Sequence, residues 1–138
     1  MRVVVSRRLA APPERVWPWL AEPDKHVKTL PPSVSQVEVH QNGDIACVVS
    51  ALGVQEAMVV RVVETDPPRR LVEKRVDGKR ESTTTFDIAA ADSGGSDVTL
   101  TSELDLPRLV ASFAKGPIEQ GLKAQLELLD QLSAAETG

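Results

Sequence analysis

Hydrophobic and polar residues alternate along residues 34–106, in short segments that are separated by turn sequences. Alternation of this kind is typical of half-buried β-strands, and Asn-Gly and Asp-Gly pairs are strong signals for tight hairpin turns. The segments predict six strands, with turns at Asn42-Gly43 and Asp77-Gly78 and a glycine-containing loop at residues 91–97. A seventh strand is expected at residues 2–9. Consecutive strands joined by hairpins form an antiparallel sheet with one face to bury.

The two hairpin turns predict which residues oppose each other across the sheet. The first turn places Val48 opposite Val37, with both side chains on the inner face. The second turn pairs Lys74 with Glu81 on the solvent face. The same register points inward Leu71, Glu73, Ser82, Thr84 and Phe86. Strict alternation along the last strand adds Val98, Leu100, Ser102 and Leu104. Glu103 is then expected in water, because a shift of one residue reverses every side chain.

The last third of the chain changes to helical spacing. Apolar residues recur every three or four positions from Leu109 to Leu132, which predicts a long amphipathic helix that starts near Pro107. Gly116-Pro117 interrupts the pattern and is expected to bend or break the helix. This helix is the one large element that can cover the buried face of the sheet. The sequence therefore predicts an α+β fold, with residues 1–138 as a single domain.

Prolines shape the segment after the first strand. Pro12-Pro13 suits the first turn of a helix, where the backbone nitrogen has no intrahelical bond to lose. Val16 and Leu20 lie four residues apart and mark the buried side of this helix. Because Pro18 removes an internal hydrogen bond, we expect a short, bent helix. A second short helix is expected to start at Pro23.

The composition excludes several classes of function. Of 138 residues, 41% are hydrophobic and 26% are charged, and the net charge is −4. This mild acidity argues against nucleic-acid binding, which needs clustered Lys and Arg. No apolar run approaches the roughly 20 residues of a membrane span, and the first ten residues lack the apolar core of a signal peptide. A single cysteine, Cys47, excludes an internal disulfide and fits a reducing compartment. We expect a cytoplasmic monomer or homodimer.

The sequence contains no recognisable catalytic or metal-binding pattern. Its two histidines and one cysteine are too widely spaced for a metal motif, and no Ser, His and acid form a nucleophile pattern. We therefore expect no metal, no cofactor and no catalytic residue. His26 is expected to face solvent on the second short helix, with a hydrogen-bond donor at the mouth of a pocket as the alternative. Cys47 is expected to be a small strand hydrophobe on the face opposite Val48.

A few polar residues fall on the predicted inner face of the sheet. They are Glu73, Ser82, Thr84 and Ser102. A small number of polar groups on an apolar wall fixes the orientation of a bound ligand, so these residues are candidates for that role. The alternative for Glu73, which lies near a hairpin end, is that its side chain reaches solvent.

The order of elements and four phrases resemble the START/SRPBCC superfamily, the helix-grip proteins similar to the birch pollen allergen. "LAAPPERVW" at residues 9–17 resembles the passage from the first strand into the first helix. "AEPDKHVKTLPPSVSQVEV" at residues 21–39 resembles the passage from the second helix into the second strand. "VVETDPPRRL" at residues 62–71 and the glycine-bearing loop before "VTLTSEL" fit later turns of the family. The chain is similar to two branches, one polyketide cyclase/dehydrase-like and one like a small subunit associated with carbon monoxide dehydrogenase.

This resemblance implies a sheet that curls around the long helix and leaves a mostly apolar cavity between them. Val16, Trp17 and Leu20 would close one end of it. The expected apolar lining is Val48, Met58, Val60, Phe86, Leu104, Phe113, Ile118 and Leu122. Gly121 is expected to leave local space beside this lining, and Glu73, Thr84 and Ser102 are the polar members.

The helix-grip resemblance, without a catalytic pattern, favours binding or transport of a hydrophobic small molecule such as a lipid. One alternative is an enzyme of the polyketide cyclase, aromatase or dehydratase type, with Glu73 as the acid or base. The other is an assembly or partner-binding protein. The resemblance transfers no catalytic residue to this chain.

Overall fold

Three short helical segments follow the first strand, in a computed structural model that describes residues 1–51, 53–77 and 80–135. Strand β1 (Arg2–Leu9) leads into α1 (Pro13–Ala21), α2 (Pro23–His26) and the 3-10 turn η1 (Val27–Thr29). The later strands are β2 (Val34–Val39), β3 (Ile45–Ala51), β4 (Val54–Asp66), β5 (Arg70–Asp77), β6 (Arg80–Ala90) and β7 (Ser96–Leu104). Helix α3 (Arg108–Ala135) completes the described part.

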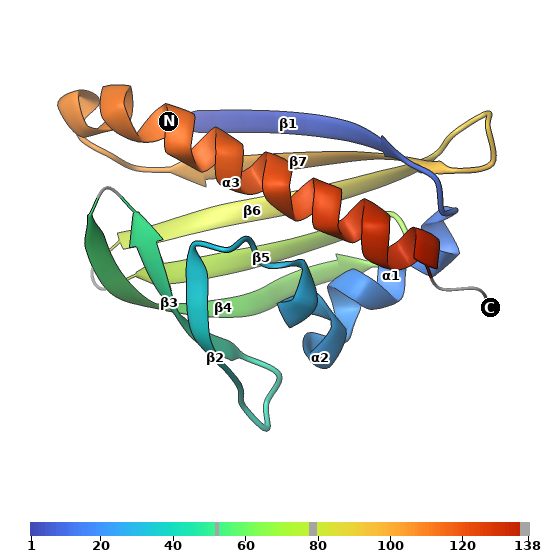
Figure 1. Cartoon of the computed structure of the whole chain (residues 1–138), viewed down its shortest axis with the longest axis horizontal. Coiled ribbons are helices and arrows are strands. Elements are labelled where there is room, and N and C mark those ends of the chain that lie inside the picture. The colour runs from blue at the N-terminus through green and yellow to red at the C-terminus, as the bar shows by residue number, and fades with distance from the viewer. Residues whose placement is uncertain (52, 78–79, 136–138) are drawn as a thin grey trace.

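Within the described residues the strands form one seven-stranded sheet, in the order β1-β7-β6-β5-β4-β3-β2. Every neighbouring pair is antiparallel. The sheet curves around one side of α3, which contacts β1 and η1 and whose C-terminal end lies beside α1 (Figure 1). This arrangement confirms the expected α+β helix-grip fold.

The register of the first hairpin differs from the prediction by one residue. Val39 opposes Ile45, because the loop takes five residues and is closed by a bond from the His40 nitrogen to the Asp44 oxygen. The Asn42 side chain accepts a 3.0 Å hydrogen bond from the Asp44 nitrogen and so holds the wider loop. A second irregularity lies between Ser35 and Glu38 in β2.

The shifted register reverses the faces of β3. Ile45 and Cys47 are buried on the inner face, and Cys47 is the small buried hydrophobe expected from the sequence. Val48 therefore lies on the outer face, opposite the exposed Ala57. The expected inward position of Val48 is wrong.

The hairpin of β5 and β6 keeps the predicted faces although its pairing differs. Lys74 opposes Thr83 and not Glu81, a shift of two residues. Because the side-chain period of a strand is two, this shift leaves each residue on its predicted face. Leu71, Glu73, Thr84 and Phe86 are buried on the inner face. The Lys74 ammonium still contacts the Glu81 carboxylate at 3.0 Å on the solvent side. The turn residues 78–79 lie outside the described residues.

Strand β7 follows the predicted alternation. Val98, Leu100 and Ser102 are buried, whereas the Glu103 side chain is 64% exposed. Leu104 is half-buried near the end of the strand.

Helix α3 runs unbroken from Arg108 to Ala135 with Pro117 inside it, so the expected break is wrong. The proline removes the bond to the carbonyl of Phe113, whose residue is 67% exposed and leaves that oxygen open to water. The C-terminal half of the helix is buried by Leu122, Leu126 and Leu129.

The main hydrophobic cluster lies between α3 and the strands β1, β7, β6 and β5. Val16 and Leu20 of α1 belong to it, as expected, and Trp17 packs against its edge. Trp19 is more deeply placed than Trp17, at 8% exposed. Helix α1 is short, as Pro18 predicts.

The exposure of α3 predicts a large difference between two leucines. Leu126→Ala removes a side chain that is 1% exposed, and it should lower the free energy of unfolding by about 2–5 kcal/mol. Leu109→Ala, at a position that is 74% exposed, should change it by less than about 0.5 kcal/mol. Urea denaturation of both variants measures the difference, and equal losses would contradict this placement of the helix.

Candidate functional site

A fully buried carboxylate lies at the centre of the inner face of the sheet. Glu73 on β5 is 0% exposed, and both of its oxygens have partners. The Arg75 guanidinium donates to Glu73 Oε1 through Nε at 3.1 Å and through Nη2 at 2.7 Å. His26 Nε2 of α2 lies 3.1 Å from Glu73 Oε2. The carboxylate is therefore held between two side chains that can carry positive charge.

His26 is itself buried, at 2% exposed, so the expected solvent-facing position is wrong. Its Nδ1 lies 3.3 Å from the carbonyl oxygen of Trp19, and the edge of its ring meets Phe86 with 5.9 Å between ring centroids. An ionised carboxylate and a carbonyl can only accept hydrogen bonds. Both ring nitrogens therefore need a proton, which only the imidazolium form supplies.

Two further side chains connect this group to α3. Arg75 Nη2 also donates to Gln125 Oε1 at 3.2 Å, and Gln125 Nε2 donates to Thr29 Oγ1 at 3.3 Å. The Thr29 hydroxyl in turn donates to the carbonyl oxygen of His26 at 2.7 Å. We name Glu73, Arg75, His26, Gln125 and Thr29 the buried polar network. It joins β5, α2 with η1, and α3 through side-chain hydrogen bonds.

The charges of this network determine the ionisation of Glu73. Burial by itself raises the pKa of the Glu73 carboxyl, because the charged form loses its hydration. The positive charges of Arg75 and His26, with their hydrogen bonds, outweigh burial and lower the pKa from 4.5 to about 2. Glu73 is therefore ionised at neutral pH.

A row of polar residues continues from Glu73 across the sheet. Thr84 on β6 lies directly opposite Glu73 on one side and opposite Ser102 of β7 on the other. Thr84 is 0% exposed, and its hydroxyl has no hydrogen-bond partner among the described residues. A buried hydroxyl without a partner is uncommon, because it loses its hydration without compensation.

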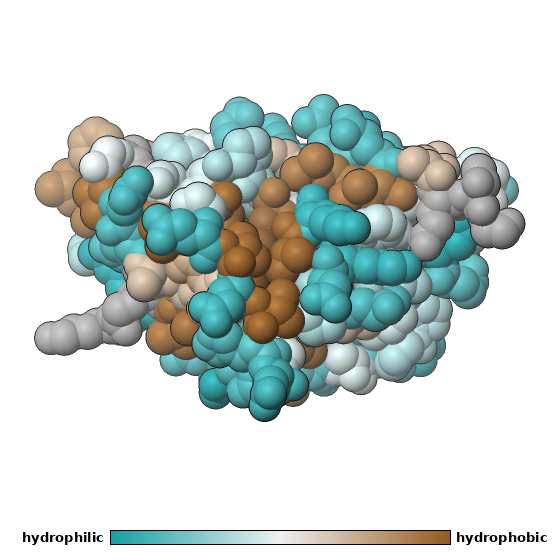
Figure 2. Space-filling model, turned by 60° about the horizontal axis from the view of Figure 1, so that its bottom comes forward, coloured by the Kyte–Doolittle hydropathy of each residue, from teal (hydrophilic) through white to brown (hydrophobic). Residues whose placement is uncertain are grey.

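A second hydrophobic cluster lies on the other side of the buried polar network. Its buried members are Leu30, Ile45, Cys47, Met58 and Val60. Burial raises the pKa of the Cys47 thiol, so this cysteine is a neutral member of the cluster at neutral pH. Val27, Val34, Val39 and Val49 pack at its border and are only partly buried. Figure 2 shows apolar residues gathered in the middle of one face of the molecule, with hydrophilic residues on both sides.

Space remains beside α3 at Gly121. A Cβ atom built on this glycine would meet nothing within 4 Å. Gly121 lies one helical turn before Gln125 and one turn after Pro117. The Arg75 side chain, which Gln125 contacts, is 16% exposed and is the most accessible charged group of the buried polar network. The interior is thus most open between the N-terminal half of α3 and this end of β5.

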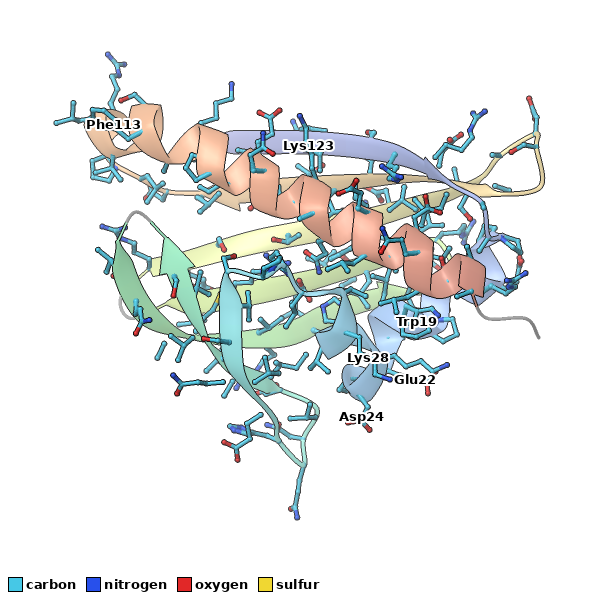
Figure 3. The ribbon with its side chains drawn as sticks, viewed as in Figure 1. Trp19, Glu22, Asp24, Lys28, Phe113 and Lys123 are labelled. Atoms are coloured by element: carbon cyan, nitrogen blue, oxygen red, sulfur yellow. The ribbon has the colours of Figure 1, made fainter. Side chains whose placement is uncertain are left out.

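The predicted lining residues take three different positions. Met58, Val60, Phe86, Leu122, Glu73, Thr84 and Ser102 are buried in the interior. Leu104, Ile118 and Gly121 are half-buried. Val48 lies on the outer face, and Phe113 is 67% exposed at the N-terminal end of α3, far from Trp19 (Figure 3). Phe113 therefore does not line an enclosed space.

Most of the buried polar network is not among the residues expected from the sequence. Arg75 lies two residues after Glu73 on one strand, so alternation already places both on the same face. Gln125 lies between Leu122 and Leu129 in the apolar stripe of α3, which is a signal for a buried polar residue. No pattern in the sequence points to the burial of His26 or Thr29.

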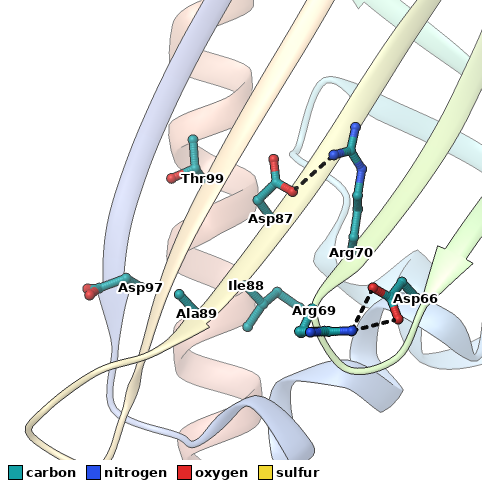
Figure 4. Close-up of a pocket in the computed structure, with 8 residues that line it drawn as sticks. All are labelled: Asp66, Arg69, Arg70, Asp87, Ile88, Ala89, Asp97 and Thr99. Carbon is teal, nitrogen blue, oxygen red and sulfur yellow. Dashed lines mark hydrogen bonds and ion pairs between the residues drawn. The ribbon is translucent and has the colours of Figure 1, made fainter.

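A groove of about 430 Å³ on the outer face of the sheet is a poor binding site. It is lined by Asp66, Arg69, Arg70, Asp87, Ile88, Ala89, Asp97 and Thr99 (Figure 4). Its arginines are already paired, Arg69 with Asp66 at 3.1 Å and Arg70 with Asp87 at 3.9 Å. The groove therefore offers little uncompensated charge to a ligand.

Two negative findings apply to the described residues. No three or more of their His, Cys, Asp and Glu side chains are grouped so that they could hold a metal ion. None of their helices combines the length and the apolar character needed to cross a membrane.

The lowered pKa of Glu73 predicts a specific pH dependence of stability. Folding keeps Glu73 ionised, so its contribution is present above the unfolded pKa of 4.5 and is lost as pH falls toward about 2. At pH 7 the wild type should exceed Glu73→Gln in free energy of unfolding by roughly 3 kcal/mol. This gap should shrink between pH 4.5 and 2, as followed by urea denaturation.

Glu81→Gln is the matched control, since the Glu81 side chain is 53% exposed and pairs with Lys74 at the surface. It should cost less than about 1 kcal/mol at pH 7. A gap for Glu73→Gln that stays constant down to pH 3 would contradict the ionised, buried state of Glu73.

Comparison of the fold with solved structures gives matches over nearly the whole chain. Protein TTHA0849 from Thermus thermophilus aligns with a TM-score of 0.83 and 20% identity, covering 100% of both chains. Protein CV1439 from Chromobacterium violaceum aligns with a TM-score of 0.76 and 23% identity, covering 98% of this chain and 99% of the other. The protein Ara h 8.0201 aligns with a TM-score of 0.71 and 13% identity, covering 99% of each chain. At these identities the matches establish the fold alone.

Sequence comparison gives the family. No curated protein matches the chain. The model of one family, described as polyketide cyclase / dehydrase and lipid transport, matches residues 1–134. Because this match extends over almost the entire sequence, the chain belongs to the polyketide cyclase / dehydrase and lipid transport family of helix-grip proteins.

Proposed function

We propose that this protein binds and carries an apolar small molecule between its sheet and α3. The observation that carries the proposal is the open space beside Gly121, at the junction of the two hydrophobic clusters. Ile118 and Leu104 are half-buried on this side and offer apolar surface to a ligand. The ligand would enter where the N-terminal half of α3 leaves the strands.

The shape of the two clusters supports this proposal. Helix α3 covers the main cluster, whereas the second cluster has several valines that are only partly buried at its border. Apolar surface that the protein itself does not cover gains free energy when a ligand covers it, by about 25 cal/mol per Å². The family's description includes lipid transport, which is consistent with an apolar cargo.

The same geometry gives less support to an enzyme of the cyclase or dehydratase type. A general acid or base must come within hydrogen-bond distance of the reacting group. Glu73 and His26 are the acid and base of the interior, yet they are 0% and 2% exposed and each is bonded on both sides. In this proposal Glu73 therefore has a structural role and not a catalytic one.

Native mass spectrometry of freshly purified protein tests the proposal directly. A co-purified apolar molecule, released when the protein is denatured, is the expected result. A cyclised or dehydrated product formed from an added linear precursor would favour the enzyme. A retained protein partner with no small molecule would favour the assembly role.

Substitution of Gly121 tests the location of the site. Gly121→Leu fills the open space and should lower the affinity for the fluorescent probe anilinonaphthalene sulfonate by roughly tenfold. Its thermal stability should stay equal or rise, because glycine is unfavourable inside a helix by about 0.8–1.0 kcal/mol.

The control for this substitution is Gln120→Leu, at the neighbouring exposed position of α3. It adds the same side chain outside the interior and should leave the affinity unchanged. If Gly121→Leu binds the probe as well as the wild type, the ligand site lies elsewhere.

A further inference from the structure

We propose that the apolar ligand carries a carboxylate, and that this carboxylate binds the Arg75 guanidinium beside Thr84. The inference rests on the proposed function and names the class of ligand: an apolar carboxylic acid. It stands on three independent features, which are the charge of the buried polar network, the free donor of Arg75 and the unpartnered hydroxyl of Thr84.

The buried polar network holds two positive charges and one negative charge. Arg75 is always protonated, and the two acceptors around His26 require its imidazolium form. Glu73 supplies the one anion, while Gln125 and Thr29 are neutral. The interior therefore contains an excess of one positive charge. Buried charge is costly unless it is paired, so an anionic group of a ligand would be stabilised there.

Arg75 is the member of the network that a ligand can reach. Its Nε and Nη2 atoms are bonded to Glu73 and Gln125, whereas its Nη1 atom has no hydrogen-bond partner among the described residues. The side chain is 16% exposed, and the open space at Gly121 begins one helical turn from its contact with Gln125. A guanidinium binds a carboxylate through short, charge-assisted hydrogen bonds.

Thr84 supplies the second donor. It lies on the inner face of β6, directly opposite Glu73, and Arg75 follows Glu73 at the next inward position of β5. The Thr84 hydroxyl is fully buried and has no partner among the described residues. A carboxylate oxygen bound beside Arg75 would give this hydroxyl an acceptor. Ligand binding would then remove the cost of a buried, unsatisfied polar group.

The test compares two ligands of equal chain length. Decanoate and 1-decanol share a ten-carbon chain and differ only in the polar group. Isothermal titration at pH 7 should give a decanoate affinity about 10- to 100-fold higher than that of decanol, the range for a hydrogen bond to a charged group. Equal affinities would overturn this inference but leave the proposed function standing. No binding of either ligand would overturn both.

Removal of Arg75 would leave the Glu73 carboxylate with a single cation, and such a variant can fail to fold. Thr84→Val is the sharper substitution, because it deletes only the unpartnered hydroxyl and keeps the shape of the side chain. It should lower decanoate affinity about three- to tenfold, while the melting temperature of the ligand-free protein stays equal or rises. A residue with a merely structural role would show the opposite: lower stability with unchanged affinity.

Thr85→Val is the matched control, on the outer face of the same strand between Val72 and Thr101. It should leave decanoate affinity within about twofold of the wild type. If Thr84→Val also binds decanoate as tightly as the wild type, the carboxylate does not bind beside Thr84 and the inference is wrong.

Discussion

A carboxylate without exposed surface stays ionised inside a protein only when cations reach it, and Glu73 is met by two. Arg75 comes from the same strand, so the sheet alone supplies the first cation. His26 comes from α2, so the second is present only when the segment between β1 and β2 folds back onto the sheet. Gln125 and Thr29 then attach α3 to the same group. The relative placement of three elements therefore depends on one ionised side chain.

This constraint also divides the interior. Polar side chains occupy its centre, so the apolar residues separate into the main cluster under α3 and the second cluster near Leu30. A uniformly apolar interior of this size would pack into one core. Here the division leaves half-buried residues and the space at Gly121 along the boundary. The feature that stabilises the fold is thus also the feature that leaves room for a ligand, with a polar wall on one side and apolar walls on the others.

The faces of the sheet can be predicted from the sequence where alternation is uninterrupted, as in β5, β6 and β7. The prediction fails for Val48, because the length of the first hairpin loop depends on a side-chain hydrogen bond of Asn42 that alternation does not contain. The pairing of Glu73 with Arg75 follows from their spacing of two residues. The burial of His26 does not, because it depends on how α2 packs against a strand that lies 47 residues away in sequence.

The central claim is that the buried polar network carries one more positive charge than negative charge, which requires a doubly protonated His26. Two-bond proton–nitrogen NMR of the histidine side chains measures this state directly, in protein labelled with nitrogen-15. At pH 7 both ring nitrogens of His26 should show the shifts of protonated imidazolium nitrogens, and Glu73→Gln should weaken this state. A spectrum in which one ring nitrogen of His26 has no proton at pH 7 would contradict the account.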